Sequence, residues 1–378
     1  MTMSGGHLVH GMGMALETPT WPAITMADAQ AVLAHFPAAG RLVDLHWHSP
    51  RPFSAAALID TDRGLHFLKR HHHRLRTPAA LVEEHRFMAH LRAAGLCVPE
   101  IVSTADGDSA VALGEWTYEL HRDAPGADLY RDRQSWTPFL SSGHAHAAGE
   151  ALARLHRASR DFAAPARGPH PLIASFTILP ALDPMAAAQA YVAARPALSG
   201  WLADRAWQRE LARLIAALGQ GLSERMAGQP ALWTHGDWHP SNLLWTDGGG
   251  VAAILDFGLA TRSCALHDLA MAIERAAFRW LDLGNDDAIG DVDAAMAIIT
   301  GYRGVAPIAA SDMETLIGLL PLIHVEFALS EIDYFAGIVG DPDQAAIAWQ
   351  DYLVGHADWF LSVAGQDFLR RLMERAMA

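Results

Sequence analysis

The sequence predicts an α+β protein of two lobes, in which a small antiparallel sheet with one long helix precedes a larger, mostly helical region. The length of 378 residues exceeds one compact core, since a domain usually holds ~100–200 residues. The composition is 51% hydrophobic and 19% charged, which supplies a core and excludes general disorder. Short apolar runs dominate the chain before Pro125-Gly126, and helical spacing dominates after it. These observations divide the chain into a loose leader (1–24), an N-terminal lobe (25–121) and a C-terminal lobe (122–378).

The elements of the N-terminal lobe follow from apolar runs and the turn signals between them. Thr25 and Asp28 begin a short helix that ends near Phe36, in the pattern of an N-cap with an acid in the first turn. Pro78 opens a longer helix that ends at Gly95. We expect strands at 42–48, 55–60, 65–70, 101–104, 110–113 and 118–120.

Helical patterns dominate the C-terminal lobe, with one strand pair between them. The pair, 243–246 and 251–255, surrounds the turn Asp247-Gly248-Gly249-Gly250. Glycine supplies the positive φ angles of a tight hairpin, so this run is interpreted as a turn and not as a phosphate-binding loop. We expect helices at 143–159, 183–195, 204–226, 266–282, 291–302, 311–338 and 342–377.

The charge and the cysteine content exclude several classes of partner. Lys and Arg number 28 against 42 Asp and Glu, so the formal charge is −14 and phosphate backbones and anionic lipid would be repelled. Cys97 and Cys264 are the two cysteines, which leaves no disulfide framework and fits a reducing compartment. No apolar run is long enough to span a bilayer. We therefore expect a soluble, cytoplasmic protein that binds neither nucleic acid nor membranes.

The sharpest pattern is the run from His235 to Asn242, H-G-D-x-x-x-x-N, followed by Asp256-Phe257-Gly258. At about one in twenty per specified position, a chance match of this pattern has odds on the order of 10⁻⁵. An Asp and an Asn at this spacing can lie on one loop, and the hairpin brings the Asp256 carboxylate back beside that Asn. The group offers oxygen ligands for a hard divalent cation and leaves one carboxylate free to receive a proton.

At these residues the chain resembles the protein-kinase-like superfamily, and within it the aminoglycoside phosphotransferase and choline kinase family, whose members act on small molecules. The resemblance implies a bilobal protein-kinase-like fold and a phosphotransferase that uses ATP and Mg²⁺. It implies that Asp237 is the catalytic base and that Asn242 and Asp256 hold Mg²⁺ on the nucleotide phosphates. It further implies structural roles for His235 and Asp268, which would brace the catalytic loop.

The N-terminal lobe contains the lysine that the resemblance requires for nucleotide binding. Lys69 is the only lysine of the chain, and it lies at the end of the predicted strand Leu65–Leu68. Glu84 lies on the helix that follows, and in the family such a Lys–Glu pair grips the α- and β-phosphates. Glu83 is the alternative partner of Lys69.

The predicted phosphate loop departs from the family pattern. Residues 48–54 stand where a glycine-rich turn is expected, but they contain no glycine, and Pro50 and Pro52 lack the amide hydrogens that would contact phosphate. Backbone amides can still approach phosphate, and the side chain of Ser54 or Arg51 can contribute a contact. We also expect nucleotide contacts from Leu120 and His121, at the end of the last strand of this lobe.

Two features of the sequence concern the acceptor. Only nine residues, Leu259 to His267, separate Gly258 from Asp268, so the long peptide platform of protein kinases is missing. Ten acidic residues and no Lys or Arg occur between Gly304 and Leu369, and Glu326 and Asp333 fall on one helix face. These two acids predict a negatively lined pocket for a cationic amino-alcohol or aminosugar, although charge runs are more often solvated helix faces.

The run His71-His72-His73, between Arg70 and Arg74, is interpreted as an exposed basic turn. Three consecutive side chains cannot converge on one metal ion in a strand or a helix. The sequence as a whole therefore predicts a kinase that transfers the γ-phosphoryl group of ATP to a hydroxyl of a small molecule, such as an amino-alcohol, an aminosugar or a hydroxy amino acid. An atypical Ser/Thr protein kinase, a non-catalytic nucleotide-binding module and a metal hydrolase remain as alternatives.

Overall fold

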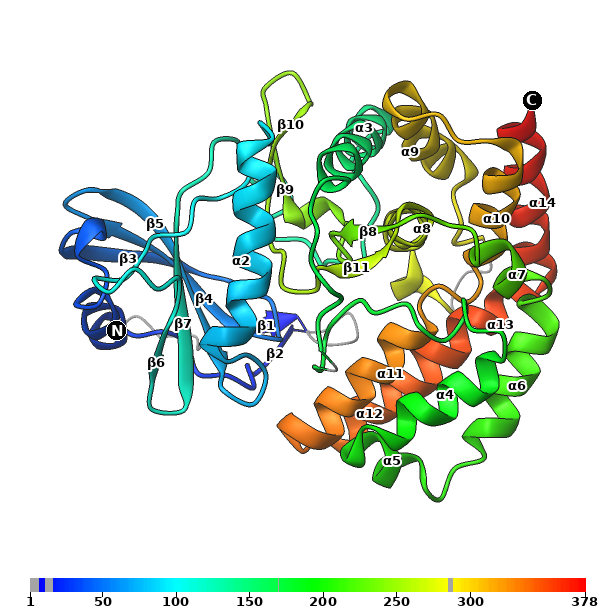
Figure 1. Ribbon diagram of the computed structural model, residues 1–378, viewed down its shortest axis with the longest axis horizontal. Coiled ribbons are helices and arrows are strands. Elements are labelled where there is room, and N and C mark those ends of the chain that lie inside the picture. The colour runs from blue at the N-terminus through cyan, green and yellow to red at the C-terminus, as the bar shows by residue number, and fades with distance from the viewer. Residues whose placement is uncertain (1–6, 11–15, 169, 285–287) are drawn as a thin grey trace. The chain divides into compact units, whose positions relative to one another are not determined.

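A computed structural model (Figure 1) describes residues 7–10, 16–168, 170–284 and 288–378. The chain forms two compact units. Unit 1 comprises Met1–Pro125 and Ala253–Leu255, and unit 2 comprises Gly126–Ala252 and Asp256–Ala378. The predicted combination of an antiparallel sheet with many helices is confirmed. Among the described residues, no helix has both the length and the apolar character that crossing a membrane requires.

Unit 1 is built on a five-stranded antiparallel sheet with the strand order β3-β4-β5-β7-β6. Its elements are β3 (Leu42–His48), β4 (Ala55–Thr61), β5 (Gly64–His72), β6 (Val111–Leu113), β7 (Trp116–Arg122) and the helices α1 (Met26–Leu33) and α2 (Pro78–Ala93). Both predicted helices and the predicted strands at 42–48, 55–60, 65–70, 110–113 and 118–120 are confirmed. The strand predicted at 101–104 is wrong, because Ile101 forms an isolated bridge to His121 there.

Strand alternation gives this sheet two different faces. Leu120 of β7 is fully buried on the face that packs against α1. Lys69 and Glu119 are paired across β5 and β7, and because neighbouring residues of a strand alternate, their side chains point to the opposite face. Helix α2 covers that second face, since its His85 hydrogen-bonds to Glu119 (Figure 1).

The segment before α1, predicted to be a loose leader, contains two short strands within its described residues. Strand β1 (Val9–His10) pairs antiparallel with β2 (Leu16–Glu17). The His10 amide donates to the Pro50 carbonyl oxygen at 2.8 Å, and Ile24 is buried in the core beside α1. This segment therefore packs on the loop that follows β3 and belongs to the sheet unit.

Unit 2 is mostly helical, as predicted. Its helices are α3 (Ser142–Ser159), α4 (Pro184–Ala193), α5 (Pro196–Leu202), α6 (Trp207–Leu218), α7 (Leu222–Met226), α8 (Ala265–Ala276), α9 (Val292–Val305), α10 (Ala310–Leu319), α11 (Val325–Tyr334), α12 (Pro342–Ile347), α13 (His356–Leu361) and α14 (Val363–Met377). The predicted hairpin is confirmed as β9 (Leu243–Trp245) and β10 (Val251–Ile254). The sequence does not predict the pairing of β8 (Ala231–Thr234) with β11 (Thr261–Cys264), because such short strands show no clear periodicity.

Three long predicted helices are divided in the structure. The prediction at 311–338 corresponds to α10, α11 and the π-helix η4 (Phe335–Val339). The prediction at 342–377 corresponds to α12, the π-helix η5 (Ala348–Gly355), α13 and α14, and the prediction at 204–226 to α6 and α7. Buried residues continue on both sides of each break, so hydrophobic periodicity alone does not locate it.

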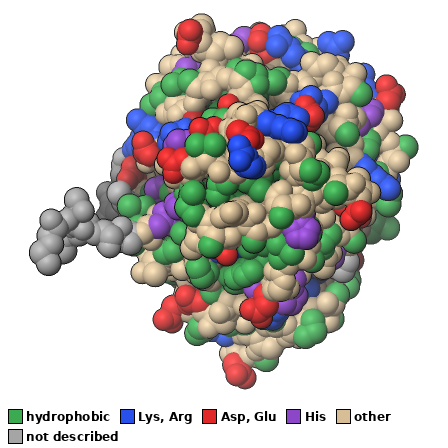
Figure 2. Space-filling view, turned by 90° about the vertical axis from the view of Figure 1, so that its left-hand side faces the viewer, with side chains coloured by type: hydrophobic (Ala, Val, Ile, Leu, Met, Phe, Trp, Pro, Cys, Tyr) green, Lys and Arg blue, Asp and Glu red, His purple; other side chains and the backbone are tan. Residues whose placement is uncertain are grey.

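Acidic and basic side chains lie next to one another on the face drawn in Figure 2. In unit 1 the exposed pairs include Arg41 with Asp62, at 3.0 Å, and Arg122 with Glu100, at 3.4 Å. Pairs of this kind contribute about 0–1 kcal/mol each, because water screens them. The stability of unit 1 therefore depends on its core and not on these surface charges.

Helices α3 and α9 of unit 2 pack closely because each has a glycine at the contact (Figure 1). A Cβ atom at Gly149 would overlap the Ile298 carbonyl oxygen, and a Cβ atom at Gly301 would overlap the His146 carbonyl oxygen. A backbone oxygen within a packed helix cannot move aside as a flexible side chain can. The contact therefore requires glycine at both positions.

We expect Gly301→Ala to lower the free energy of unfolding by about 1–3 kcal/mol, because the added methyl group overpacks the α3–α9 contact. Gly304→Ala is the matched control on α9, since Gly304 is exposed and a Cβ atom there meets nothing within 4 Å. This control should keep or raise stability by up to about 1 kcal/mol, because alanine has the higher helix propensity. Urea unfolding followed by circular dichroism measures both variants, and equal stability would show that the contact tolerates a side chain.

Candidate active site

The motif His235–Asn242 follows β8 as a loop that ends in the 3₁₀ turn η2 (Pro240–Asn242). Gly236 has a φ angle of 75°, in the left-handed region that favours glycine. A Cβ atom at this position would lie 2.5 Å from the Ala174 Cβ atom and 3.0 Å from the Leu259 carbonyl oxygen. Both the backbone angle and the close packing therefore require glycine between the histidine and the aspartate.

The Asp268 carboxylate on α8 holds this loop in place. Its Oδ2 accepts a hydrogen bond from the His235 amide and its Oδ1 accepts one from the Gly236 amide, both at 2.8 Å. His156 Nε2 donates to Oδ2 at 3.0 Å, and the Tyr302 hydroxyl donates to His156 Nδ1 at 2.8 Å. Burial opposes ionisation, but the bonds from His156 and from the backbone lower the pKa of Asp268 below its usual value. The loop is thus bound to a buried, charged carboxylate.

Asp237 is fixed by three side chains at the tip of the loop. Asn242 Nδ2 donates to Asp237 Oδ2 at 3.0 Å and to the Asp237 carbonyl oxygen at 2.9 Å. Arg275 Nη1, on α8, donates to Asp237 Oδ1, and His239 Nε2 lies 3.4 Å from Oδ2. Burial would raise the pKa of Asp237, but Arg275 and His239 hold it well below its usual value. An ionised carboxylate in this position can orient a hydroxyl group and then receive its proton.

Asn242 and Asp256 offer oxygen atoms of the kind that a hard divalent cation requires. Because Asn242 Nδ2 donates to Asp237, its Oδ1 is the atom that is left to serve as a ligand. Asp256 has a φ angle of 55°, and its Oδ1 accepts the Gly258 amide at 3.3 Å. A non-glycine residue in this region costs about 1–2 kcal/mol, and such strain concentrates at functional sites. The amide and carboxylate oxygens fit Mg²⁺.

In unit 1, Lys69 lies beside the buried carboxylate of Glu119. Lys69 Nζ is 3.8 Å from Glu119 Oε1. Three histidines bond to the same carboxylate, with Nε2–O distances of 2.9 Å for His71, 2.6 Å for His85 and 2.8 Å for His121. Burial opposes ionisation of this fully buried group, but His121 and Lys69 hold the pKa of Glu119 well below its usual value. Lys69 therefore belongs to a buried network centred on one negative charge.

The interpretation of His71–His73 as an exposed turn is corrected by this network. Strand β5 continues to His72, so alternation sends the His71 side chain inward to Glu119. Ligand atoms of His85, Glu119 and His121 lie within 4.8 Å of one another, as a metal site would require. Their direct contacts of 2.6 and 2.8 Å are hydrogen bonds, however, and are shorter than the separation of about 3.3 Å between ligand atoms around tetrahedral zinc. We therefore interpret the cluster as a hydrogen-bonded network.

The other predicted nucleotide residues of unit 1 lie in different environments. Glu84 is buried on α2, the helix that also carries His85. His121 lies on the same face of the sheet as Lys69 and bonds to Glu119. The Leu120 side chain lies in the core on the opposite face, so a ligand on the Lys69 side can meet only its backbone.

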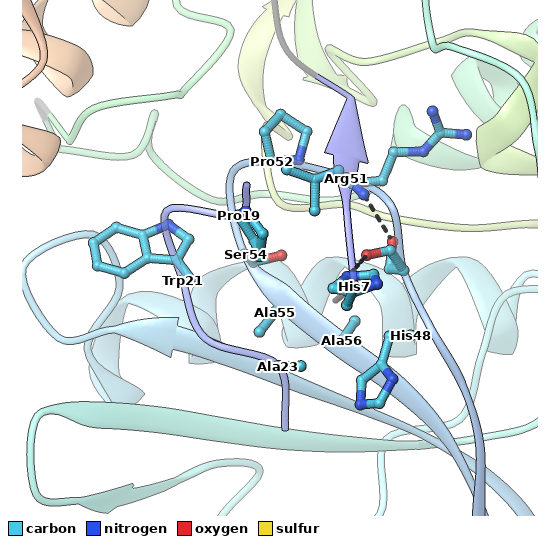
Figure 3. A pocket seen from close by; sticks show the side chains of 12 residues that line it. His7, Pro19, Trp21, Ala23, His48, Arg51, Pro52, Ser54, Ala55 and Ala56 are labelled. Carbon is cyan, nitrogen blue, oxygen red and sulfur yellow. Dashed lines mark hydrogen bonds between the residues drawn. The ribbon is translucent and has the colours of Figure 1, made fainter. Parts of the chain in front are cut away.

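The glycine-free loop after β3 packs against the N-terminal segment (Figure 3). His7 Nε2 donates to the Ser49 carbonyl oxygen at 3.1 Å, and the Arg51 amide donates to Ser49 Oγ at 3.3 Å. Ser54 lines a cavity of about 10 Å³ between the loop and this segment, which is roughly the space of one water molecule. The Arg51 guanidinium points away from that cavity (Figure 3). The conformation of this loop is thus stabilised by contacts with the N-terminal segment and does not depend on glycine residues.

The two acids predicted for the acceptor pocket bond to backbone amides of unit 2. Glu326 accepts hydrogen bonds from the Thr177 amide at 2.6 Å, the Thr177 hydroxyl at 2.8 Å and the Ile178 amide at 2.9 Å. Asp333 Oδ1 accepts the Leu198 amide at 3.2 Å. Both acids are buried on α11. Their carboxylates therefore connect α11 to neighbouring segments, a structural role that neither interpretation of the sequence includes.

Sequence reasoning misses Arg275, beside Asp237 in unit 2, and Glu119, beside Lys69 in unit 1. Arg275 follows Asp268 by two helical turns, so both project from one face of α8, and this spacing is visible in the sequence. Glu119 lies opposite Lys69 only in the register of β5 with β7. The sequence predicts both strands but not which residues face each other.

We expect Asp268→Asn to lower the free energy of unfolding by about 2–4 kcal/mol at neutral pH, because one amide group cannot accept all three hydrogen bonds. The pKa of Asp268 is lowered in the folded protein, so its contribution is present at neutral pH and is lost as the pH falls toward that pKa. The difference between wild type and variant should therefore shrink in acid. Asp367→Asn, at an exposed ion pair, is the control and should change stability by less than about 1 kcal/mol. Chemical unfolding between neutral and acid pH measures this, and a constant difference would contradict it.

Comparisons of the sequence with known proteins identify its family and several relatives. A sequence model of the phosphotransferase enzyme family matches residues 50–308. The homoserine kinase of Acidiphilium cryptum (strain JF-5) is 24% identical over 272 residues, which cover 70% of this chain and 72% of that protein. The homoserine kinase of Granulibacter bethesdensis (strain ATCC BAA-1260 / CGDNIH1) is 25% identical over 254 residues, or 65% and 67% of the two chains.

Solved structures share the fold. The microcompartment-associated aminopropanol kinase is similar with a TM-score of 0.61 and 18% identity, over 90% of this chain and 99% of that one. An aminoglycoside phosphotransferase from Alicyclobacillus acidocaldarius subsp. acidocaldarius DSM 446 is similar with a TM-score of 0.54 and 19% identity, over 92% and 96% of the two chains. These similarities confirm the protein-kinase-like fold. Because the family match spans more than half of its length, the chain belongs to the phosphotransferase enzyme family.

Proposed function

We propose that this enzyme transfers the γ-phosphoryl group of ATP to a hydroxyl group of a small molecule, with Mg²⁺ as its cofactor. The observation that carries the proposal is the hydrogen bond between Asn242 and Asp237, on a loop that is held by Asp268. In the kinases that the motif resembles, this pair links the acceptor hydroxyl to the metal site. Membership of the phosphotransferase family supports the same reaction class. Dependence on ATP fits a cytoplasmic enzyme.

Asp237 binds and orients the acceptor in this reaction. The hydroxyl oxygen forms a bond to the γ-phosphorus, the bond from that phosphorus to the β–γ bridging oxygen breaks, and ADP leaves. The hydroxyl proton passes to the Asp237 carboxylate. Arg275 keeps this carboxylate ionised and weakly basic, which suits a proton transfer that comes late in a loose transition state. Bound Mg²⁺, held by Asn242 and Asp256, would neutralise charge on the phosphates.

Lys69 is proposed to bind the α- and β-phosphates of the nucleotide. The Glu119 carboxylate, 3.8 Å away and bonded to three histidines, is fixed and can restrict the Lys69 side chain to one direction. Glu119 then acts as a counter-ion of Lys69 in addition to Glu84, the partner that the family pattern implies. A lysine held by a buried counter-ion loses less conformational entropy when it binds phosphate.

The segment after Asp256-Phe257-Gly258 favours a small acceptor over a protein. Strand β11 begins at Thr261 and pairs with β8, and α8 follows it directly. These elements use the short span before Asp268, where protein kinases have a long segment that binds the peptide. The similarity to homoserine kinases and to an aminopropanol kinase makes small amino compounds with a hydroxyl group the first acceptors to test.

A screen of ATP consumption with amino-alcohols, aminosugars and hydroxy amino acids tests the proposal. We expect at least one acceptor to raise Mg²⁺-dependent ADP formation, and we expect Asp237→Asn to lower that rate by about 100–10,000-fold, since the base is lost. Asp247→Asn, in the exposed turn of the β9–β10 hairpin, is the matched control and should retain the rate. A rate that Asp237→Asn leaves unchanged would contradict the assigned role.

Lys69→Met tests the nucleotide site. We expect its Kd for MgATP to rise by about 10–100-fold, because a charge-assisted hydrogen bond contributes about 1.5–3 kcal/mol. Arg74→Met, at an exposed position shortly after β5, is the matched control for the loss of one positive charge and should bind as wild type does. Calorimetric titration measures both, and unchanged affinity in Lys69→Met would limit this residue to the Glu119 network.

A further inference from the structure

Arg275 has hydrogen-bond donors that the described part of the protein does not use. Its side chain is 5% exposed, its Nη1 bonds to Asp237, and its Cζ atom lies 4.9 Å from the centre of the Phe327 ring. Within the described residues, its Nε and Nη2 atoms have no hydrogen-bond partner. A buried donor without a partner costs about 1–3 kcal/mol, and more when it is charged. Buried donors of this kind in a site are therefore expected to meet a ligand.

Glu331 is a second buried group with an unused atom. It lies on α11, and its Oε2 has no hydrogen-bond partner among the residues that the structure describes. Burial raises the pKa of Glu331 to about 8, with Arg275 opposing the rise and the Asp237 and Glu274 carboxylates adding to it. A buried carboxyl group in this state is relieved by a cation that binds to it, because the ionised form then becomes favourable.

Tyr352 adds a hydroxyl group from the π-helix η5. This hydroxyl is buried and has no hydrogen-bond partner in the described ranges. Burial and then the Glu274 carboxylate raise its pKa well above the usual value, and Arg275, Glu331 and Asp237 act on it as well. π-Helical turns are rare in proteins, and many of those that occur lie at functional sites. Helices α8 and α11 and the π-helix η5 thus bring unused polar atoms to the neighbourhood of Asp237.

We propose that the acceptor is a zwitterionic hydroxy amino acid, whose carboxylate binds Arg275, whose ammonium group binds Glu331 and whose hydroxyl meets Asp237. This inference rests on the proposed phosphotransferase function and specifies its acceptor. Arg275 Nε and Nη2 form the paired donors that match the two oxygens of a carboxylate. The Tyr352 hydroxyl is a third donor for the same carboxylate.

The same charges disfavour a polycationic aminosugar. Arg275 would repel additional amines beside Asp237, and the Glu326 carboxylate is engaged by backbone amides. Glu274 Oε1 accepts His356 Nδ1 at 2.8 Å, so this acid already has a partner. Glu331 therefore supplies one negative charge, which fits one ammonium group.

Three acceptors with the same hydroxyl-bearing chain test the proposal. L-Homoserine has both charged groups, 3-aminopropan-1-ol has only the amine, and 4-hydroxybutanoate has only the carboxylate. We expect kcat/KM for L-homoserine to exceed that for each of the others by at least about 100-fold. The reason is that 3-aminopropan-1-ol leaves the buried Arg275 guanidinium without a carboxylate, and 4-hydroxybutanoate lacks the ammonium group that Glu331 would bind. The ratio of kcat/KM for L-serine to kcat/KM for ethanolamine repeats the comparison with a shorter acceptor.

Two variants test which side chain binds the carboxylate of the acceptor and which binds its ammonium group. Arg275→Gln should remove the preference for L-homoserine over 3-aminopropan-1-ol, and Glu331→Gln should remove the preference over 4-hydroxybutanoate. Glu314→Gln, an exposed acid of α10, is the matched control and should keep both ratios. Because each ratio compares two acceptors on one protein, the effect of Arg275 on Asp237 cancels. Thermal unfolding and MgATP titration establish that each variant is folded and binds nucleotide.

Calorimetry can measure proton release on binding of L-homoserine, which a purely structural Glu331 would not produce. At pH 7 Glu331 is mostly protonated in the free enzyme, and an ammonium group beside it lowers its pKa. Binding of L-homoserine should therefore release up to about one proton, seen as a binding enthalpy that depends on the ionisation enthalpy of the buffer. Glu331→Gln should abolish this dependence, with Asp237, Glu274 and Arg275 still in place.

Several results would overturn the inference. One is equal kcat/KM for L-homoserine and 3-aminopropan-1-ol. Another is a lower kcat of Arg275→Gln for both acceptors at an unchanged ratio, which would mean that the guanidinium acts on the transferred phosphoryl group. If MgATP binds but neither hydroxy amino acid is bound or phosphorylated, the inference also fails while a kinase with another acceptor remains. If MgATP does not bind and no acceptor stimulates ADP formation, the proposed function itself fails.

Discussion

The Asp268 carboxylate is the interaction on which the catalytic loop depends. The loop leaves β8 through a left-handed glycine, so the amides of His235 and Gly236 cannot join a helix or a strand ladder, and Asp268 accepts both. His156 orients the carboxylate and is itself bonded to Tyr302, the residue after Gly301. The close packing of α3 on α9 therefore belongs to the same construction, because it sets the distance at which the histidine and the tyrosine meet.

Helix α8 also determines the charge of the site. It carries Asp268 in its first turn and Arg275 in its last turn, the ends at which the helix dipole favours an acid and a base. Asp268 fixes the backbone of the loop, and Arg275 keeps the Asp237 carboxylate ionised. Position and ionisation of the proposed base thus come from one rigid element. Movement of α8 would change both at once.

Within each unit, the sequence predicts the contacts that are local and misses those that depend on pairing between distant segments. Asp237 and Asn242 lie within one short loop, so their spacing alone predicts that they meet, and the structure joins them by a hydrogen bond. Glu119 becomes the partner of Lys69 only through strand register, and His71 becomes buried only because β5 is longer than its apolar run. Hydrophobic periodicity likewise continues through the π-helix η5, although that segment positions Tyr352.

The acids of α11 show why composition could not predict the acceptor. Glu326, Glu331 and Asp333 are alike in a count of charges, and all three are buried. Glu326 and Asp333 bond to backbone amides, which gives their charges a structural role. Glu331 has an unused oxygen and a raised pKa near Arg275, so its charge depends on what binds beside it. A single acid of this kind next to a single arginine favours an acceptor with one charge of each sign over the polycation that a run of acids suggests.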